Sequence, residues 1–191
     1  MSLYEFLLFL HITAAVIWVG GATMIQLFAF RSLRSRDPDR IANVTSDIEW
    51  IGSRILVPTS LAAFLLGVGL VWESSAWGFG DDWIVIGLVL FAVTFLAGAL
   101  FFGPESGRIS RLVASQGAGS PAAQARIRRI LVLSRIDLVV LLLIVFDMAA
   151  KPSFSDGWTI ALAVVVAVAL SLLLTVRRSA APELTAAATA E

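Results

Sequence analysis

Residues 3–30 read LYEFLLFLHITAAVIWVGGATMIQLFAF, and this stretch decides the fold class. It contains one acidic residue, Glu5, and no lysine or arginine. It is long and apolar enough to cross a hydrocarbon core of about 30 Å as a helix, which takes about 20 residues. Its basic residues follow it, at Arg31, Arg34 and Arg36. A secretory signal carries its positive charge before the apolar run, so this order predicts a retained transmembrane helix.

Four further segments have the same apolar character, at about residues 55–72, 83–102, 130–150 and 158–176. None of them alternates as a barrel strand does, and an open strand cannot satisfy its backbone groups in lipid. The sequence therefore predicts an all-α polytopic membrane protein. We expect a single domain over residues 1–178, built from a bundle of five transmembrane helices, and a disordered cytoplasmic tail over residues 179–191.

Composition supports a membrane protein and excludes several classes of site. Hydrophobic residues make up 59% of the chain and charged residues 15%, against roughly 45–50% and about 25% in soluble domains. The net charge is zero, so no basic field favours nucleic acid as a partner. The chain has no cysteine and a single histidine, which excludes disulfides and zinc or copper sites built from several such ligands.

The distribution of charge predicts the orientation. In a five-pass protein, thirteen of the fourteen lysines and arginines fall on one side of the membrane, and the exception is Lys151. The positive-inside rule makes that side cytoplasmic, so we expect the N-terminus outside and the C-terminus inside. Tryptophans mark the outer interface, where amphipathic rings prefer to lie: Trp72, Trp77, Trp83 and Trp158.

The connections are expected to contain short helices. Ile41, Val44, Ile48 and Ile51 recur at helical spacing between charged residues, which indicates an amphipathic helix on the membrane surface or on the base of the bundle. Ser120-Pro121 is typical of an N-cap followed by proline at the first helical position. The fourth helix is therefore expected to begin there, before it enters the membrane near Ile130.

Polar side chains inside the bilayer are the candidate functional residues, because each is costly there. His11 lies about two turns into the first helix, where it can bind iron, carry a proton or bond a backbone carbonyl. Asp137 lies in the fourth helix; Arg135, two residues away, does not face it, so Arg54 or Arg31 is the expected partner. Two interpretations stay open for Asp137: an intramembrane ion pair and a proton site.

A third acidic residue, Asp147, is expected near the outer interface. Lys151 follows it by four residues, in the orientation that favours an ion pair along a helix. We predict this pair to be structural. The sequence contains no nucleophile–base pair, phosphate loop or paired carboxylates, so it indicates no enzymatic activity.

The first helix also resembles a known group of bacterial membrane proteins. His11 is followed by Trp18 after six residues, and then by Gly20-Gly21. This pattern resembles the opening helix of the CopD-type copper-resistance proteins, the HemJ-type protoporphyrinogen oxidases and an uncharacterised family of predicted integral membrane proteins. The overall size, and the run from Asp147 to Pro152 at the end of the fourth helix, resemble the uncharacterised family.

The resemblance implies a small helical bundle in a bacterial cell membrane. It also implies a role in binding haem b for His11, which matches the haem-linked histidine of the HemJ-type enzymes. Those enzymes carry an intramembrane lysine, whereas the only lysine here is Lys151; protoporphyrinogen oxidation is therefore not implied. Copper transport is not implied either, because the chain has no cysteine and only one histidine to bind copper.

Three functional hypotheses follow. The first is a haem-binding protein with His11 as an axial ligand of the iron. Met148, or His11 of a second copy in a homodimer, would supply the other ligand. The second is an accessory protein without cofactor, which contacts membrane lipid and partner proteins. The third is a small proton-coupled transporter that uses Asp137.

Overall fold

The computed structural model describes residues 1–35, 37–157 and 166–167, and these residues form helices and loops without strands. The predicted all-α fold is therefore confirmed for this part of the chain. The helices are α1 (Leu3–Ser35), α2 (Pro38–Ile51), α3 (Val57–Glu73), α4 (Asp82–Leu96), α5 (Gly103–Gln116) and α6 (Pro121–Ala150). Two wider π-helical turns join them in pairs: η1 (Gly52–Leu56) and η2 (Ala97–Phe102).

These turns make long continuous helices of α2–η1–α3 and α4–η2–α5. Each π turn comes immediately before a proline of the next helix, Pro58 in α3 and Pro104 in α5. Proline has no N–H and its ring collides with the carbonyl four residues earlier, so a wider turn allows the helix to continue past it. The helices that contain the predicted spans 55–72 and 83–102 therefore extend beyond them, and the amphipathic helix expected around Ile41 to Ile51 continues through η1 directly into α3.

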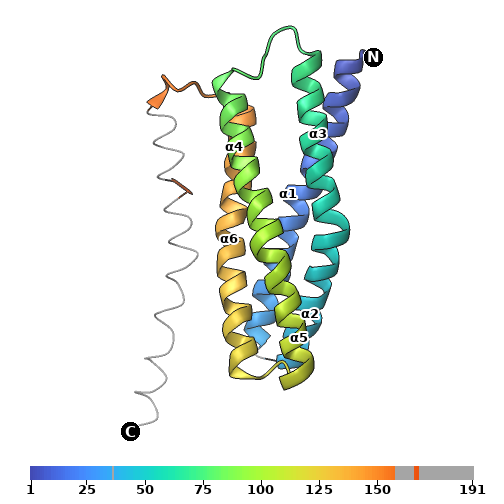
Figure 1. The fold of residues 1–191 in the computed structure, drawn as a ribbon, viewed down its shortest axis with the longest axis vertical. Helices are drawn as coiled ribbons and strands as arrows, with labels where there is room; N and C mark the ends of the chain where they lie inside the picture. Colours follow the sequence, from blue (N-terminus) through green and yellow to red (C-terminus); the bar gives the residue numbers. More distant parts are fainter. Residues whose placement is uncertain (36, 158–165, 168–191) are drawn as a thin grey trace.

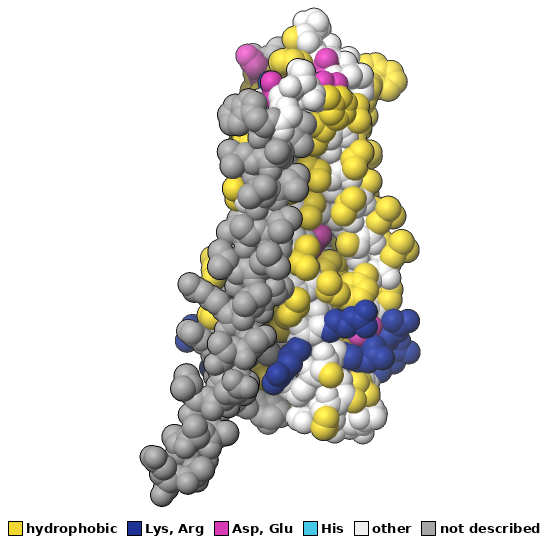
Figure 2. All heavy atoms as spheres, turned by 90° about the vertical axis from the view of Figure 1, so that its left-hand side faces the viewer, with side chains coloured by type: hydrophobic (Ala, Val, Ile, Leu, Met, Phe, Trp, Pro, Cys, Tyr) yellow, Lys and Arg dark blue, Asp and Glu magenta, His cyan; other side chains and the backbone are white. Residues whose placement is uncertain are grey.

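The four long helices run antiparallel and side by side (Figure 1). The N-terminus, the α3–α4 loop and the end of α6 lie together at one end, which we call the acidic end. Its acidic residues are Glu5, Glu73, Asp81, Asp82 and Asp156. The α1–α2 and α5–α6 connections lie at the other, which we call the arginine end; it includes Arg108, Arg111, Arg126, Arg128 and Arg129. Figure 2 shows hydrophobic side chains in between.

Three helices of the described part are long and apolar enough to cross a membrane: Leu3–Ser32, Asn43–Glu73 and Asp82–Gln116. Helix α6 has 30 residues, but its apolar run is interrupted by Arg135, Asp137 and Asp147, and it is not among the three. The predicted fifth helix at 158–176 and the predicted tail at 179–191 lie outside the described residues, apart from residues 166–167. Five passes and their orientation therefore remain predictions.

Close contacts through glycine bring the helices together. A Cβ atom on Gly21 of α1 would lie 2.8 Å from Leu56 Cδ2, and one on Gly67 of α3 would lie 3.2 Å from His11 Cε1. Small residues serve this purpose in membrane bundles, where close van der Waals contact drives helix association. At mid-height, Phe91 of α4 stacks on Phe64 of α3 and meets Trp18 of α1 edge to face.

The arginine end has a core of its own, like that of a soluble domain. Ile109 is completely buried, and Ile41 and Ile127 pack with it, so that α2, α5 and α6 meet at one point. The Ser110 hydroxyl donates a hydrogen bond to Glu49 and ties α5 to α2. The predicted N-cap of α6 is confirmed, since the Ser120 hydroxyl oxygen accepts from the Ala123 N–H. These contacts hold the arginine end rigidly below the apolar band.

Candidate functional site

His11 lies between α1 and α3, where it contacts the backbone of α3. Its Nδ1 atom is 2.8 Å from the carbonyl oxygen of Ala63. A carbonyl oxygen only accepts, so Nδ1 carries the proton and donates it. In a neutral imidazole, Nε2 then holds the free lone pair. The absence of a side chain at Gly67 makes room for the ring, because a Cβ there would lie 3.2 Å from His11 Cε1 and 3.5 Å from Nδ1.

Met148, the other candidate haem ligand, lies at a different helix pair. Its terminal methyl carbon is close to α4, 2.8 Å from the position that a Cβ on Gly87 would take. The structure therefore places His11 at the α1–α3 interface and Met148 at the α4–α6 interface, and gives no contact that joins them. Among the described residues, no three histidine, aspartate or glutamate side chains gather as a metal site.

Asp147 is the most deeply buried charged residue of the described helices, with 2% of its surface exposed. Neither carboxylate oxygen has a hydrogen-bond partner in the part of the chain that the structure describes. The side chain faces α4 at Gly87, where an added Cβ would lie 3.0 Å from Asp147 Oδ2. One turn earlier in α4, the Trp83 Nε1 atom is also buried without a partner. Among the described residues, Asp147 thus brings two acceptors without a partner to the α4–α6 interface, and Trp83 of α4 has a buried donor without one.

The predicted ion pair between Asp147 and Lys151 is wrong. Lys151 ends α6 in the left-handed conformation, with φ of 47°, and only its backbone N–H bonds to Asp147, at the carbonyl oxygen. This change of direction carries the lysine side chain away from the helix face. The ammonium group lies instead over the rings of Trp77 and Trp83, 4.3 and 5.2 Å from their centroids.

Asp137 is half-buried in α6, between the two ends of the bundle. Within the described residues, the ion pairs are those of Glu105, and none joins Asp137 to Arg54 or to Arg31, the two expected partners. Arg54 lies in the π turn η1 and Arg135 lies in α6, two residues from Asp137. The structure therefore does not bring the predicted intramembrane ion pair together in the part that it describes.

Glu105, in contrast, is a buried carboxylate with two partners, and sequence reasoning did not single it out. It is 4% exposed and binds Arg126 Nη1 at 2.7 Å and Arg108 Nη1 at 3.3 Å. It lies beyond the apolar run that ends at Phe102. The hydrogen bond from Arg126 holds the pKa of its carboxyl below the ordinary value of 4.5. A signal was available: Glu105 is the only acidic residue between Asp82 and Asp137.

Comparison with known proteins identifies a family for most of the chain. The family model described as "Predicted integral membrane protein (DUF2269)" matches residues 5–152. The match includes the whole of α2 to α6 and the first-helix pattern at His11, Trp18 and Gly20-Gly21. No curated protein and no solved structure matches the chain. The predicted resemblance to an uncharacterised membrane family is thereby confirmed, whereas nothing in the comparisons supports the wider relation to CopD-type and HemJ-type proteins.

Proposed function

We propose, for a chain that belongs to the DUF2269 family of predicted integral membrane proteins, that it binds haem b through His11. The observation that carries this proposal is the hydrogen bond from His11 Nδ1 to Ala63 O. Histidines that bind metals commonly donate their other ring N–H to a carbonyl or carboxylate, which fixes the tautomer and the ring orientation. His11 has this arrangement, with Nε2 left to bind iron.

His11 would supply one ligand to the haem iron. His11 is the only histidine, and Met148 packs on Gly87 at another helix pair, so one chain supplies one imidazole and no second ligand from these candidates. A second copy of His11 in a homodimer, or a small exogenous ligand, would take the remaining position. Haem held in this way supplies one-electron or gas-binding chemistry. The role of the protein would be to hold the ring of His11 against α3 through the Ala63 carbonyl oxygen.

The test is the spectrum of the purified full-length chain from cells supplied with a haem precursor. Haem bound through imidazole gives a strong Soret band that shifts on reduction. His11→Ala should abolish the band and leave the protein folded, because alanine is well tolerated in a helix. A colourless wild type that also fails to take up added haemin would refute the proposal and leave His11 as a structural hydrogen-bond donor in an accessory protein.

A matched pair of glycine variants separates ligation from folding. Gly67→Ala places a methyl group 3.2 Å from His11 Cε1 and should turn the ring away from Ala63 O, which would weaken haem binding or change its spectrum. Gly20→Ala is the control, because nothing lies within 4 Å of the added atom. If the two variants bind haem equally well, the hydrogen bond to Ala63 does not orient a ligand.

A second candidate function is favoured by the unpartnered carboxylate of Asp147. An intramembrane carboxylate without a donor has to be satisfied by a proton, a cation or water, and such groups often mark ion pathways. Asp137 lies ten residues earlier on α6, about 15 Å along the helix axis. The hypothesis of a small proton-coupled transporter used Asp137 alone, and Asp147 adds a second carboxylate on the same helix.

Proton movement is measured in vesicles that contain the purified protein and a pH-sensitive dye. On this second hypothesis, an imposed potential drives protons through wild type faster than through Asp147→Asn or Asp137→Asn. The vesicles without protein give the background rate. Equal rates in wild type, both variants and empty vesicles would exclude the proton-coupled function.

The topology that both functions assume is five passes with the N-terminus outside a bacterial cytoplasmic membrane. The segregation of arginines at one end of the described bundle supports it. Reporter fusions after Leu33, Trp77, Ser115, Ser155 and Ser179 should report in, out, in, out and in. A reversed sign at any of the first four positions would overturn the orientation or the order of the described helices.

A further inference from the structure

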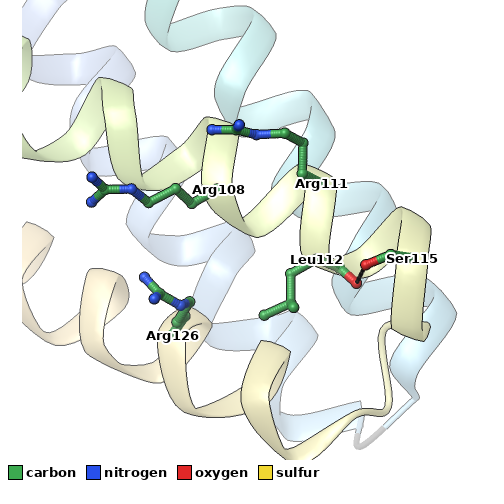
Figure 3. Close-up of a pocket in the computed structure, with 5 residues that line it drawn as sticks. All are labelled: Arg108, Arg111, Leu112, Ser115 and Arg126. Carbon is green, nitrogen blue, oxygen red and sulfur yellow. Dashed lines mark hydrogen bonds between the residues drawn. The ribbon is translucent and has the colours of Figure 1, made fainter.

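A hollow at the arginine end lies between α5 and α6. Its volume is about 370 Å³, and it is lined by Arg108, Arg111, Leu112, Ser115 and Arg126. Figure 3 shows Arg108 and Arg111 on α5 and Arg126 on α6, with their guanidinium groups extending to the same side. The Ser115 hydroxyl donates to the Leu112 carbonyl oxygen. The donors that remain for a ligand in this hollow therefore belong to the three arginines.

The hollow carries more positive charge than its own carboxylate neutralises. Glu105 is the one acidic partner, and it binds Arg108 and Arg126. Arg111 instead donates from Nε to the carbonyl oxygen of Gly107, which leaves its two terminal amino groups available. The side chains of Arg108 and Arg126 remain 60% and 46% exposed. Three guanidinium groups against one carboxylate favour an anion with several acceptor oxygens.

The position of the hollow along the bundle indicates which class of anion it binds. Figure 2 shows basic side chains at the lower border of the hydrophobic band. If this band spans the hydrocarbon core, that border is the level of the phosphates of one leaflet. On the same continuous helix, Val93, Leu96 and Leu100 are strongly exposed and form one apolar face. Leu100 and Arg111 are separated by about three helical turns and therefore share that face. Along this helix, an exposed apolar face is thus followed by the guanidinium groups that line the hollow.

We propose that this hollow binds the phosphate of an anionic phospholipid, whose acyl chains lie along the exposed face of α4 and η2. The guanidinium groups of Arg111, Arg108 and Arg126 hold the phosphate oxygens. Basic pockets between transmembrane helices bind anionic headgroups in this way. The site lies at the opposite end of the bundle from Asp147, and it does not depend on haem or on proton movement.

The experiment uses the full-length protein in detergent, titrated with phosphatidylglycerol and followed by native mass spectrometry. Arg111→Gln is the informative variant, because it removes a lining charge and leaves both ion pairs of Glu105 intact. We expect it to weaken binding about tenfold, which corresponds to roughly 1.4 kcal/mol. Arg128→Gln is the matched control: it removes the same charge from the same end, but Arg128 is exposed and does not line the hollow.

Two further arms identify the source of the phosphate. Phosphatidylcholine should bind more weakly than phosphatidylglycerol, because its own cation offsets the phosphate charge. Inorganic phosphate should not compete at millimolar concentration, since it lacks the acyl chains. Equal effects of Arg111→Gln and Arg128→Gln would overturn the site, as would equal binding of the two lipids. Displacement of phosphatidylglycerol by millimolar inorganic phosphate would overturn the assignment of the site to a lipid. Melting curves without lipid verify that both variants are folded.

Discussion

Two buried carboxylates lie towards opposite ends of the bundle, and they differ in whether a basic side chain binds them. Glu105, at the arginine end, is 4% exposed and is bound by two guanidinium groups. Asp147, towards the acidic end, is 2% exposed and has no hydrogen-bond partner on either oxygen among the described residues. A buried charge is costly unless it is paired and hydrogen-bonded. Glu105 meets this condition within the protein, whereas Asp147 does not.

The difference between the two carboxylates follows from how the arginine end and the apolar band are each held together. At the arginine end, an isoleucine core and an ion-pair network connect α2, α5 and α6, as they would in a soluble domain. Within the apolar band, many large side chains face outward, and the helices meet through glycines and aromatic rings. An unpartnered carboxylate in that second region contributes nothing evident to stability, which is why it is a candidate for function.

The largest expected effect comes from breaking the paired carboxylate. Glu105→Gln removes the charge that Arg108 and Arg126 share, and we expect it to lower the free energy of unfolding by roughly 2–3 kcal/mol, as for hydrogen bonds to charged groups. This loss is smaller than the roughly 3–5 kcal/mol for a fully buried pair, because both arginines are exposed and water solvates them. Thermal unfolding in detergent measures the change. A Glu105→Gln variant as stable as wild type would mean that the ion pairs do not hold α5 to α6.

A smaller loss is expected from crowding the unpaired carboxylate. Gly87→Ala places a methyl group 2.8 Å from Met148 Cε and 3.0 Å from Asp147 Oδ2. Overpacking of this kind costs roughly 1–3 kcal/mol, and the low end is expected because both neighbours are side-chain ends that can shift. Gly98→Ala in η2 is the control, since no atom lies within 4 Å of its added carbon. Equal melting temperatures for the two variants would show that α4 and α6 are not in close contact at Gly87.

Much of the fold followed from sequence, and the exceptions have physical causes. The apolar runs located every described long helix, and Ser120-Pro121 located the start of α6 correctly. The predicted spans 55–72 and 83–102 were bounded by apolar character alone, whereas the helices that contain them continue through the regions of Pro58 and Pro104. Here π turns absorb the missing N–H, and no residue pattern distinguishes such a turn from a true end.

The candidate site was less predictable, because it depends on where helix faces meet. His11 was found from its isolation in an apolar run, but its contact with Ala63 depends on the α1–α3 packing. The four-residue spacing between Asp147 and Lys151 led to the prediction that they form an ion pair. That spacing is misleading where a helix ends in a left-handed residue, since the side chain then leaves the helix face. Glu105 was missed because its main partner, Arg126, is 21 residues away.

A pH titration should also reveal the paired carboxylate. The pKa of Glu105 is held below 4.5 in the folded protein, so its contribution to stability is complete above that pH and is lost as the pH falls through the folded value. The difference in melting temperature between wild type and Glu105→Gln should therefore shrink as the pH is lowered from 6 to about 3. A constant difference over this range would mean that the charge of Glu105 is not what stabilises the fold.

The smallest expected effect on stability comes from Asp147, the buried carboxylate to which no basic side chain is bound. Asp147→Asn preserves the shape of the side chain and removes only its ability to ionise. Because neither oxygen has a partner, no hydrogen bond is lost, and the melting temperature should stay close to that of wild type. Removing one member of a buried pair would instead cost about 3–5 kcal/mol. A loss of that size in Asp147→Asn would show that the carboxylate has a strong partner, such as a bound cation, in the membrane. Unchanged stability together with a lost proton flux would assign Asp147 to function, and unchanged stability with unchanged flux would leave haem binding through His11 as the stronger hypothesis.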